Sequence, residues 1–97
     1  MIKDAEIAMV NAATFALDYQ DKNYNADVDE IIKQFTKEAN YYNIKSEVKI
    51  YSISAINEIL KLKREKANKG KTNKQLMQIF MKRVPEISKT IKEDSDY

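Results

Sequence analysis

A single glycine, Gly70, and a single proline, Pro85, are the only strong breaks in the backbone pattern of this 97-residue chain. Sheet proteins of this size need tight turns, and the favoured two-residue turns require a positive φ angle, which glycine adopts at the least cost. A chain with one glycine can form few hairpins, whereas helices can be joined by Asn- and Asp-rich links. The shortage of glycine therefore predicts an all-α fold.

Apolar residues recur at helical spacing in four parts of the chain. The first of these segments is apolar around most of its circumference, so we expect it to be the central helix of a compact bundle. Its alanines would allow another helix to approach closely. The chain is expected to form one domain, residues 1–97, in which residues 92–97 fray. The predicted helices cover residues 3–20, 27–43, 46–68 and 73–91.

Polar residues mark the expected helix ends. Asp27 and Glu30 have the spacing of a capping box, in which each side chain bonds the backbone amide of the other residue, and Thr72 and Gln75 repeat that spacing before the last helix. Gly70 is expected to end the third helix, where the neighbouring lysines suit the negative end of the helix dipole.

Two local alternatives stay open. Residues 47–53 alternate in polarity and include β-branched residues, so a short strand competes with the start of the third helix. Pro85 lies inside the last helical segment, where a proline removes a hydrogen bond and clashes with the preceding turn. Because the apolar residues keep their phase across it, Pro85 either kinks a fourth helix or begins a fifth one.

The composition restricts the available chemistry. Cysteine and histidine are both absent, which excludes disulfides and thiolate catalysis and removes the commonest general base and metal ligand. We therefore expect a protein that is not an enzyme, with no catalytic residues, no cofactor and no metal. No apolar run approaches the ~18 residues that span a bilayer, and the N-terminus lacks the pattern of a signal peptide. We expect a cytoplasmic protein that contacts no membrane.

The link between the first two helices, residues 21–29, places oxygen-bearing side chains at every second position, as a calcium loop does. An EF-hand loop also needs glycine at its sixth position and an acid at its twelfth, where this chain has Ala26 and Ile32. We therefore interpret the segment as a polar link that ends in a helix cap.

Gly70, Lys71 and Thr72 match the end of the phosphate-binding loop GxxxxGK[ST]. The first glycine of that loop would be residue 65, which is Glu65, and a lysine-rich helix precedes it instead of a buried strand. The favoured interpretation is a helix end followed by the N-cap of the next helix.

Charge is distributed unevenly along the chain. Residues 1–43 carry four lysines against eight acids, whereas residues 61–83 carry nine Lys or Arg residues against one acid. This basic segment surrounds the predicted turn between the third and fourth helices. It is either a nucleic-acid contact or a solvated helix end that is attracted to the acidic first half. The candidate contact residues for nucleic acid or an acidic partner are Lys61, Arg64, Lys66, Lys69, Lys71, Lys74, Lys82 and Arg83.

Two classes of function remain. The first is a non-enzymatic helical interaction module that binds another protein or forms a homo-oligomer, because the first helix carries more apolar surface than a small bundle can cover. The alternative is a nucleic-acid-binding module that uses residues 61–83. Tyrosines near the helix ends are expected to seal the rim of the core rather than to form a binding patch. They are Tyr19, Tyr24, Tyr41, Tyr42 and Tyr51.

Overall fold

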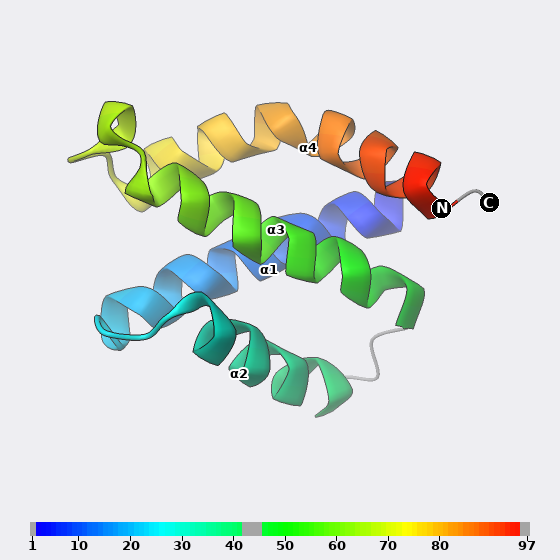
Figure 1. Ribbon diagram of the computed structural model, residues 1–97, viewed down its shortest axis with the longest axis horizontal. Helices are drawn as coiled ribbons and strands as arrows, with labels where there is room; N and C mark the ends of the chain where they lie inside the picture. Colours follow the sequence, from blue (N-terminus) through cyan, green and yellow to red (C-terminus); the bar gives the residue numbers. More distant parts are fainter. Residues whose placement is uncertain (1, 42–45, 96–97) are drawn as a thin grey trace.

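A computed structural model describes the backbone of residues 2–41 and 46–95 and the side chains of residues 4–38 and 48–92. The described backbone contains four α-helices and one short 3₁₀ turn (Figure 1). The predicted all-α fold is therefore confirmed. The elements are α1 (Ile2–Lys22), α2 (Val28–Tyr41), α3 (Ser46–Arg64), η1 (Lys66–Asn68) and α4 (Asn73–Ser95).

The helices α1 and α3 form the centre of the bundle. Each of them contacts all three other α-helices, and their contact with one another is the most extensive in the molecule. In Figure 1, α3 crosses in front of α1, with α4 above this pair and α2 below it. The shortest extent of the molecule is 19 Å, which corresponds to about two helix layers at the usual spacing. The expected central position of the first helix is confirmed, and α3 shares it.

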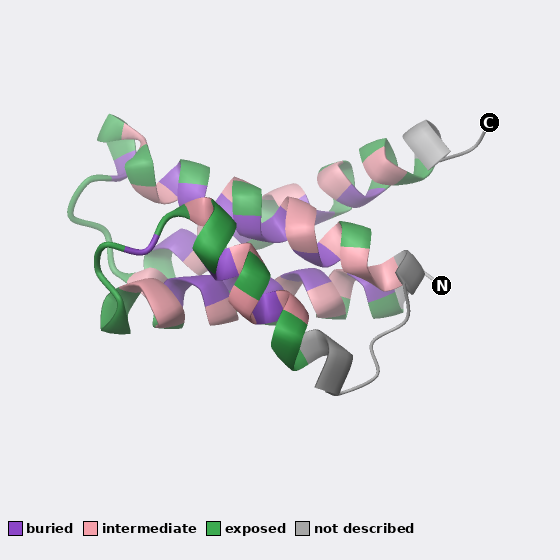
Figure 2. Ribbon diagram, turned by 60° about the horizontal axis from the view of Figure 1, so that its bottom comes forward, coloured by how far each residue is buried: buried purple, intermediate pink, exposed green. Residues whose placement is uncertain are grey.

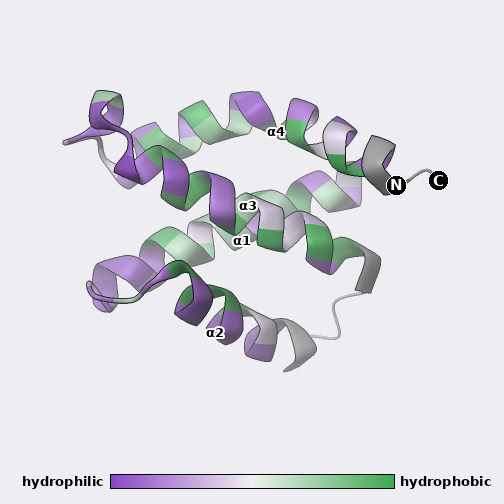
Figure 3. Cartoon of the chain, in the orientation of Figure 1, coloured by the Kyte–Doolittle hydropathy of each residue, from purple (hydrophilic) through white to green (hydrophobic). Residues whose placement is uncertain are grey.

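Small side chains explain the close approach of α1 to α3. Ala12, Ala13 and Ala16 of α1 and Ala55 of α3 are fully buried. An alanine leaves room for a neighbouring backbone to come near, and larger apolar residues fill the space on either side. The purple stripes of buried residues in Figure 2 and the green apolar stripes in Figure 3 both face the bundle interior.

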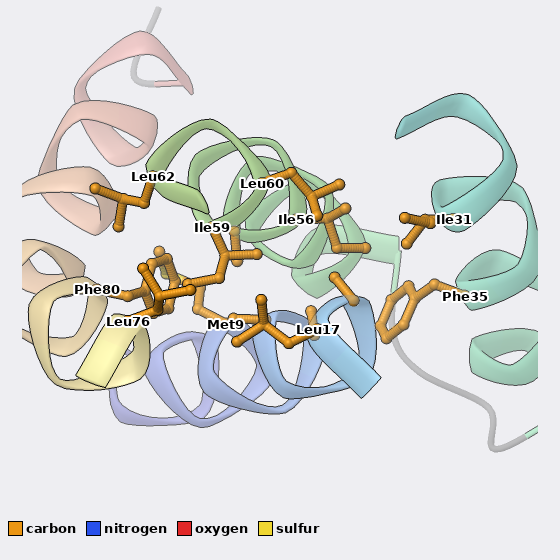
Figure 4. Close-up of a cluster of buried hydrophobic side chains, with 14 of the residues drawn as sticks. Met9, Leu17, Ile31, Phe35, Ile56, Ile59, Leu60, Leu62, Leu76 and Phe80 are labelled. Atoms are coloured by element: carbon orange, nitrogen blue, oxygen red, sulfur yellow. The ribbon is translucent and has the colours of Figure 1, made fainter. Parts of the chain in front are cut away.

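The helix α3 packs against α2 on one side and against α4 on the other. Its buried residues Ile56 and Leu60 point toward α2, where Ile31 lies, whereas Ile59 and Leu62 lie on the side of Leu76 and Phe80 of α4 (Figure 4). This double apolar face requires that α3 is buried on both flanks.

The start of α3 settles one of the local alternatives. Residues 47–53 are helical, so the competing strand is wrong. Ser52 is fully buried, and its hydroxyl donates to the carbonyl of Val48 one turn earlier (3.3 Å). An isolated strand here would have had no neighbouring strand among the described residues to pair with.

The third helix ends earlier than the sequence predicted. The α-helix stops at Arg64 and not at residue 68. Glu65 adopts an extended conformation (φ −66°, ψ 136°), and the 3₁₀ turn follows. The reason lies in Asn68, a buried residue whose side-chain amide donates to the carbonyl of Leu62 (2.9 Å). The same carbonyl also accepts a hydrogen bond from the amide of Glu65 (3.2 Å), so two donors hold the last turn of α3.

Pro85 does not begin a fifth helix. The helix α4 runs without interruption from Asn73 to Ser95, so four helices and not five are described. Pro85 is exposed, while Val84 and Phe80 are buried on the same helix. The penalty of an interior proline is offset because the buried residues on both sides keep α4 docked. The backbone of residues 92–95 is helical, and residues 96–97 of the expected tail lie outside the described residues.

Both predicted N-caps are present. Asp27 accepts a hydrogen bond from the amide of Glu30 (2.8 Å), and the Glu30 carboxylate accepts one from the hydroxyl of Tyr19 (3.3 Å) instead of completing a reciprocal box. At α4 the box is complete: the amide of Thr72 donates to the Gln75 side chain (2.9 Å), and the amide of Gln75 donates to the Thr72 hydroxyl (3.2 Å).

Candidate functional site

An apolar groove lies between the first half of α1 and the middle of α4. Val10, Val84 and Pro85 line it together with the polar residues Glu6 and Asn11, and it encloses a hollow of about 360 Å³. Ile7 of α1 and Met81 of α4 stand at its edges, and each is 53% exposed. Few large apolar side chains are this exposed among the described residues, and two of them line one groove.

The groove follows from helical spacing. On α4, Met81, Val84 and Pro85 occupy positions i, i+3 and i+4, so their side chains share one face of the helix. On α1, Ile7 and Val10 are three residues apart and lie side by side. The excess of apolar surface on the first helix was therefore visible in the sequence. The contribution of Met81 was missed, although its spacing from Val84 could have revealed it.

The basic candidates do not form one surface. Lys61 and Arg83 line a second groove, between α3 and α4, together with the acids Glu58 and Glu86. The Arg83 guanidinium forms an ion pair with Glu58 at 2.8 Å. Lys82 is exposed on α4, about 12 Å along the helix from Lys74 at the usual rise per residue.

The remaining candidates are gathered in one turn. We call this the basic turn, and all of its cations are exposed. Backbone bonds fold it compactly: the amide of Lys69 donates to the carbonyl of Lys66 (3.1 Å), and that of Lys71 donates to the carbonyl of Asn68 (3.1 Å). The basic turn consists of Arg64, Lys66, Lys69, Lys71 and Lys74.

The centre of the basic turn is Asn68, which the sequence analysis did not single out. Besides its bond to Leu62, its side-chain oxygen accepts a hydrogen bond from the Lys71 ammonium group (2.9 Å). Gly70 has a φ of +87°, the left-handed conformation that glycine adopts most readily. The turn is therefore held by specific bonds, and Thr72 caps α4 directly after it.

The acidic first half lies beside part of this surface, since Arg64 lines a hollow together with Asp27 and Asp29 at the start of α2. Asp21, at the end of α1, contacts the Lys63 ammonium group (3.6 Å) and accepts a hydrogen bond from the Asn73 side chain (2.6 Å). Lys63 does not belong to the basic turn. The Glu65 carboxylate lies within the turn and contacts the Asn68 amide (3.4 Å). The four lysines of this turn therefore share their segment with one acid, Glu65, whereas Arg64 lies beside Asp27 and Asp29.

The link between α1 and α2 matches the interpretation as a polar connection. Its last residue, Asp27, is the N-cap of α2. Among the described residues, no group of three or more acidic side chains lies close enough together to hold a metal ion.

The tyrosines divide between core rim and solvent. Tyr19 and Tyr51 pack against the core, as expected, and Tyr19 stacks on Phe15 with ring centroids 5.8 Å apart. The prediction is wrong for Tyr24, which is 87% exposed at the link after α1. The Tyr41 side chain and the whole of Tyr42 lie outside the described residues. Desolvation, and then the charge and hydrogen bond of Glu30, raise the pKa of Tyr19 above its ordinary value.

Comparison of the chain with protein-family models, with curated proteins and with solved structures found no match. Within residues 2–41 and 46–95, none of the helices has the length and apolar character needed to cross a membrane. The apolar groove and the basic turn are therefore the two candidate functional surfaces of this chain.

Proposed function

We propose that this protein is a non-enzymatic helical interaction module that self-associates through the apolar groove between α1 and α4. The observation that carries the proposal is the pair of half-exposed apolar side chains, Ile7 and Met81, at the edges of one hollow. Exposed apolar surface of this kind has a free-energy cost in water, and burial against a partner removes it.

A second copy of the chain suits this groove because one patch carries both a projection and a depression. In a twofold dimer the same patch meets itself, so Met81 of one copy would enter the hollow beside Val84 and Pro85 of the other. Glu6 of α1 lines the groove, and the exposed Lys82 directly follows Met81 in α4. Two copies facing each other would therefore be able to pair opposite charges.

The non-enzymatic part of the proposal is supported by composition. A chain without histidine or cysteine lacks the side chains that most often act as general base and nucleophile.

The test is sedimentation velocity over a range of protein concentrations. We expect the wild-type chain to shift toward a dimer as concentration rises, and Met81→Asp to stay monomeric because it would bury an unpaired charge. Ile7→Asp should have the same effect from the other side of the groove.

The matched control is Ile50→Asp on α3. Ile50 is 52% exposed, almost the same as Met81, but it does not line the groove. This variant should dimerise like the wild type. A wild-type chain that stays monomeric at every concentration, or a dimer that Met81→Asp leaves intact, would contradict the proposal. If the wild-type chain stays monomeric, the remaining occupant for the groove is a different polypeptide.

A further inference from the structure

The basic turn is a second surface that self-association does not use. Its cations lie at the end of α3, around η1 and in the first turn of α4, whereas the apolar groove lies along the first half of α1 and the middle of α4. Backbone hydrogen bonds hold the turn in one compact shape, and Lys66, Lys69 and Lys74 are exposed. Cations this close in the chain lie within about a Debye length, so they act on an anion together.

We propose that the basic turn binds the phosphate backbone of duplex nucleic acid. Lysine ammonium groups attract phosphates as point charges, and phosphate contacts carry no information on base sequence. Only Arg64 among the five cations is an arginine. The binding is therefore electrostatic and independent of sequence.

Two other anionic partners fit the turn less well. Single-stranded nucleic acid is held by stacking on aromatic side chains, and the turn contains none. Binding to a membrane surface is strengthened by apolar side chains that insert between lipids. None of the exposed large apolar residues belongs to this turn; among the described residues they are Ile7, Tyr24, Ile50 and Met81.

The contact works through side chains and not through the helix end. The N-terminus of α4 is already occupied, since Thr72 and Gln75 bond each other's amides. Lys71 donates one hydrogen bond to Asn68 and keeps its charge, so it contributes to the potential while it also fixes the turn.

The experiment measures binding of the full chain to a fluorescently labelled DNA duplex by anisotropy, at a series of salt concentrations. For about four neutralised phosphates, the plot of log affinity against log salt should have a slope of about −3 to −4. The variant Lys66→Glu/Lys69→Glu should weaken binding at least ~10-fold at low salt, and flatten that slope.

The matched control is Lys33→Glu/Lys37→Glu on α2, where both lysines are exposed. The two double variants have the same net charge, so their difference reports the position of the charge and not its total. The control should retain most of the wild-type affinity. Circular dichroism of each variant verifies that it is folded.

Three results would overturn the inference. They are no duplex binding at low salt, equal weakening by both double variants, and equal or stronger binding to single strands or to phosphatidylserine vesicles. The last result would assign the turn to one of those ligands. Because Met81→Asp leaves the basic turn intact, its DNA binding should stay close to that of the wild-type monomer and well above that of Lys66→Glu/Lys69→Glu, which separates this inference from the proposed self-association.

Discussion

Asn68 has the largest structural role of any single polar residue in the turn after α3. It is buried, its amide group caps the carbonyl of Leu62, and its oxygen receives the Lys71 ammonium group. A local pattern of spacing does not reveal such a role, because the bond to Leu62 depends on the chain first leaving the helix at Glu65. This is why the sequence predicted a helix that continued to residue 68.

We expect Asn68→Ala to lower the free energy of unfolding by about 1–3 kcal/mol, because it removes the hydrogen bonds that the buried Asn68 side chain forms with the Leu62 carbonyl and the Lys71 ammonium group. Urea denaturation measures the change. Asn57→Ala is the control, since Asn57 is exposed and its side-chain amide donates to the Ile53 carbonyl of its own helix. Equal losses in the two variants would show that Asn68 has no special role.

At the scale of the elements, the residues that begin helices were easier to predict than those that end them. The caps at Asp27 and Thr72 were correct because the Asp or Thr side chain and the amide that it accepts are only three residues apart. Pro85 was ambiguous for a different reason. The free-energy cost of a proline inside a helix follows from local backbone geometry. Whether the helix continues through Pro85 depends on how α4 packs against the rest of the protein.

We expect Pro85→Ala to stabilise the protein by about 1–3 kcal/mol. Alanine restores an amide that can donate to the carbonyl of Met81 one turn earlier, and it removes the ring clash. Thermal or urea denaturation tests this, with Glu86→Ala as the control at the adjacent exposed position. A destabilised Pro85→Ala variant would indicate that the proline ring itself is needed where it lines the groove beside Val84.

On the scale of the whole molecule, the sequence predicted the fold class and the central place of α1, because both depend on how apolar residues are spaced. It did not predict which helices pair, since helical spacing describes one helix at a time. The same limit applies to the surfaces. The basic residues were visible as a run, but only the folded chain separates the basic turn from Arg83, which pairs with Glu58.

We expect Ala16→Leu to destabilise the fold by about 1–3 kcal/mol, because it adds bulk where α1 packs in the fully buried core. Thr14→Leu is the control on the same helix, at an exposed position, and should change stability by less than about 0.5 kcal/mol. The measurement is urea denaturation. If both variants were equally stable, α1 would not be as closely packed as its buried alanines indicate.

The pairing of α1 with α3 has a consequence for folding kinetics. These two helices are separated in sequence by the whole of α2, yet they make the most extensive contact. The chain must therefore close a long loop before its main interface exists, and loop closure costs entropy that local contacts do not. A bundle of equal length in which every helix packs first on its sequence neighbour would avoid that search. This chain should fold more slowly than such a bundle, at a rate set by the encounter of two distant segments.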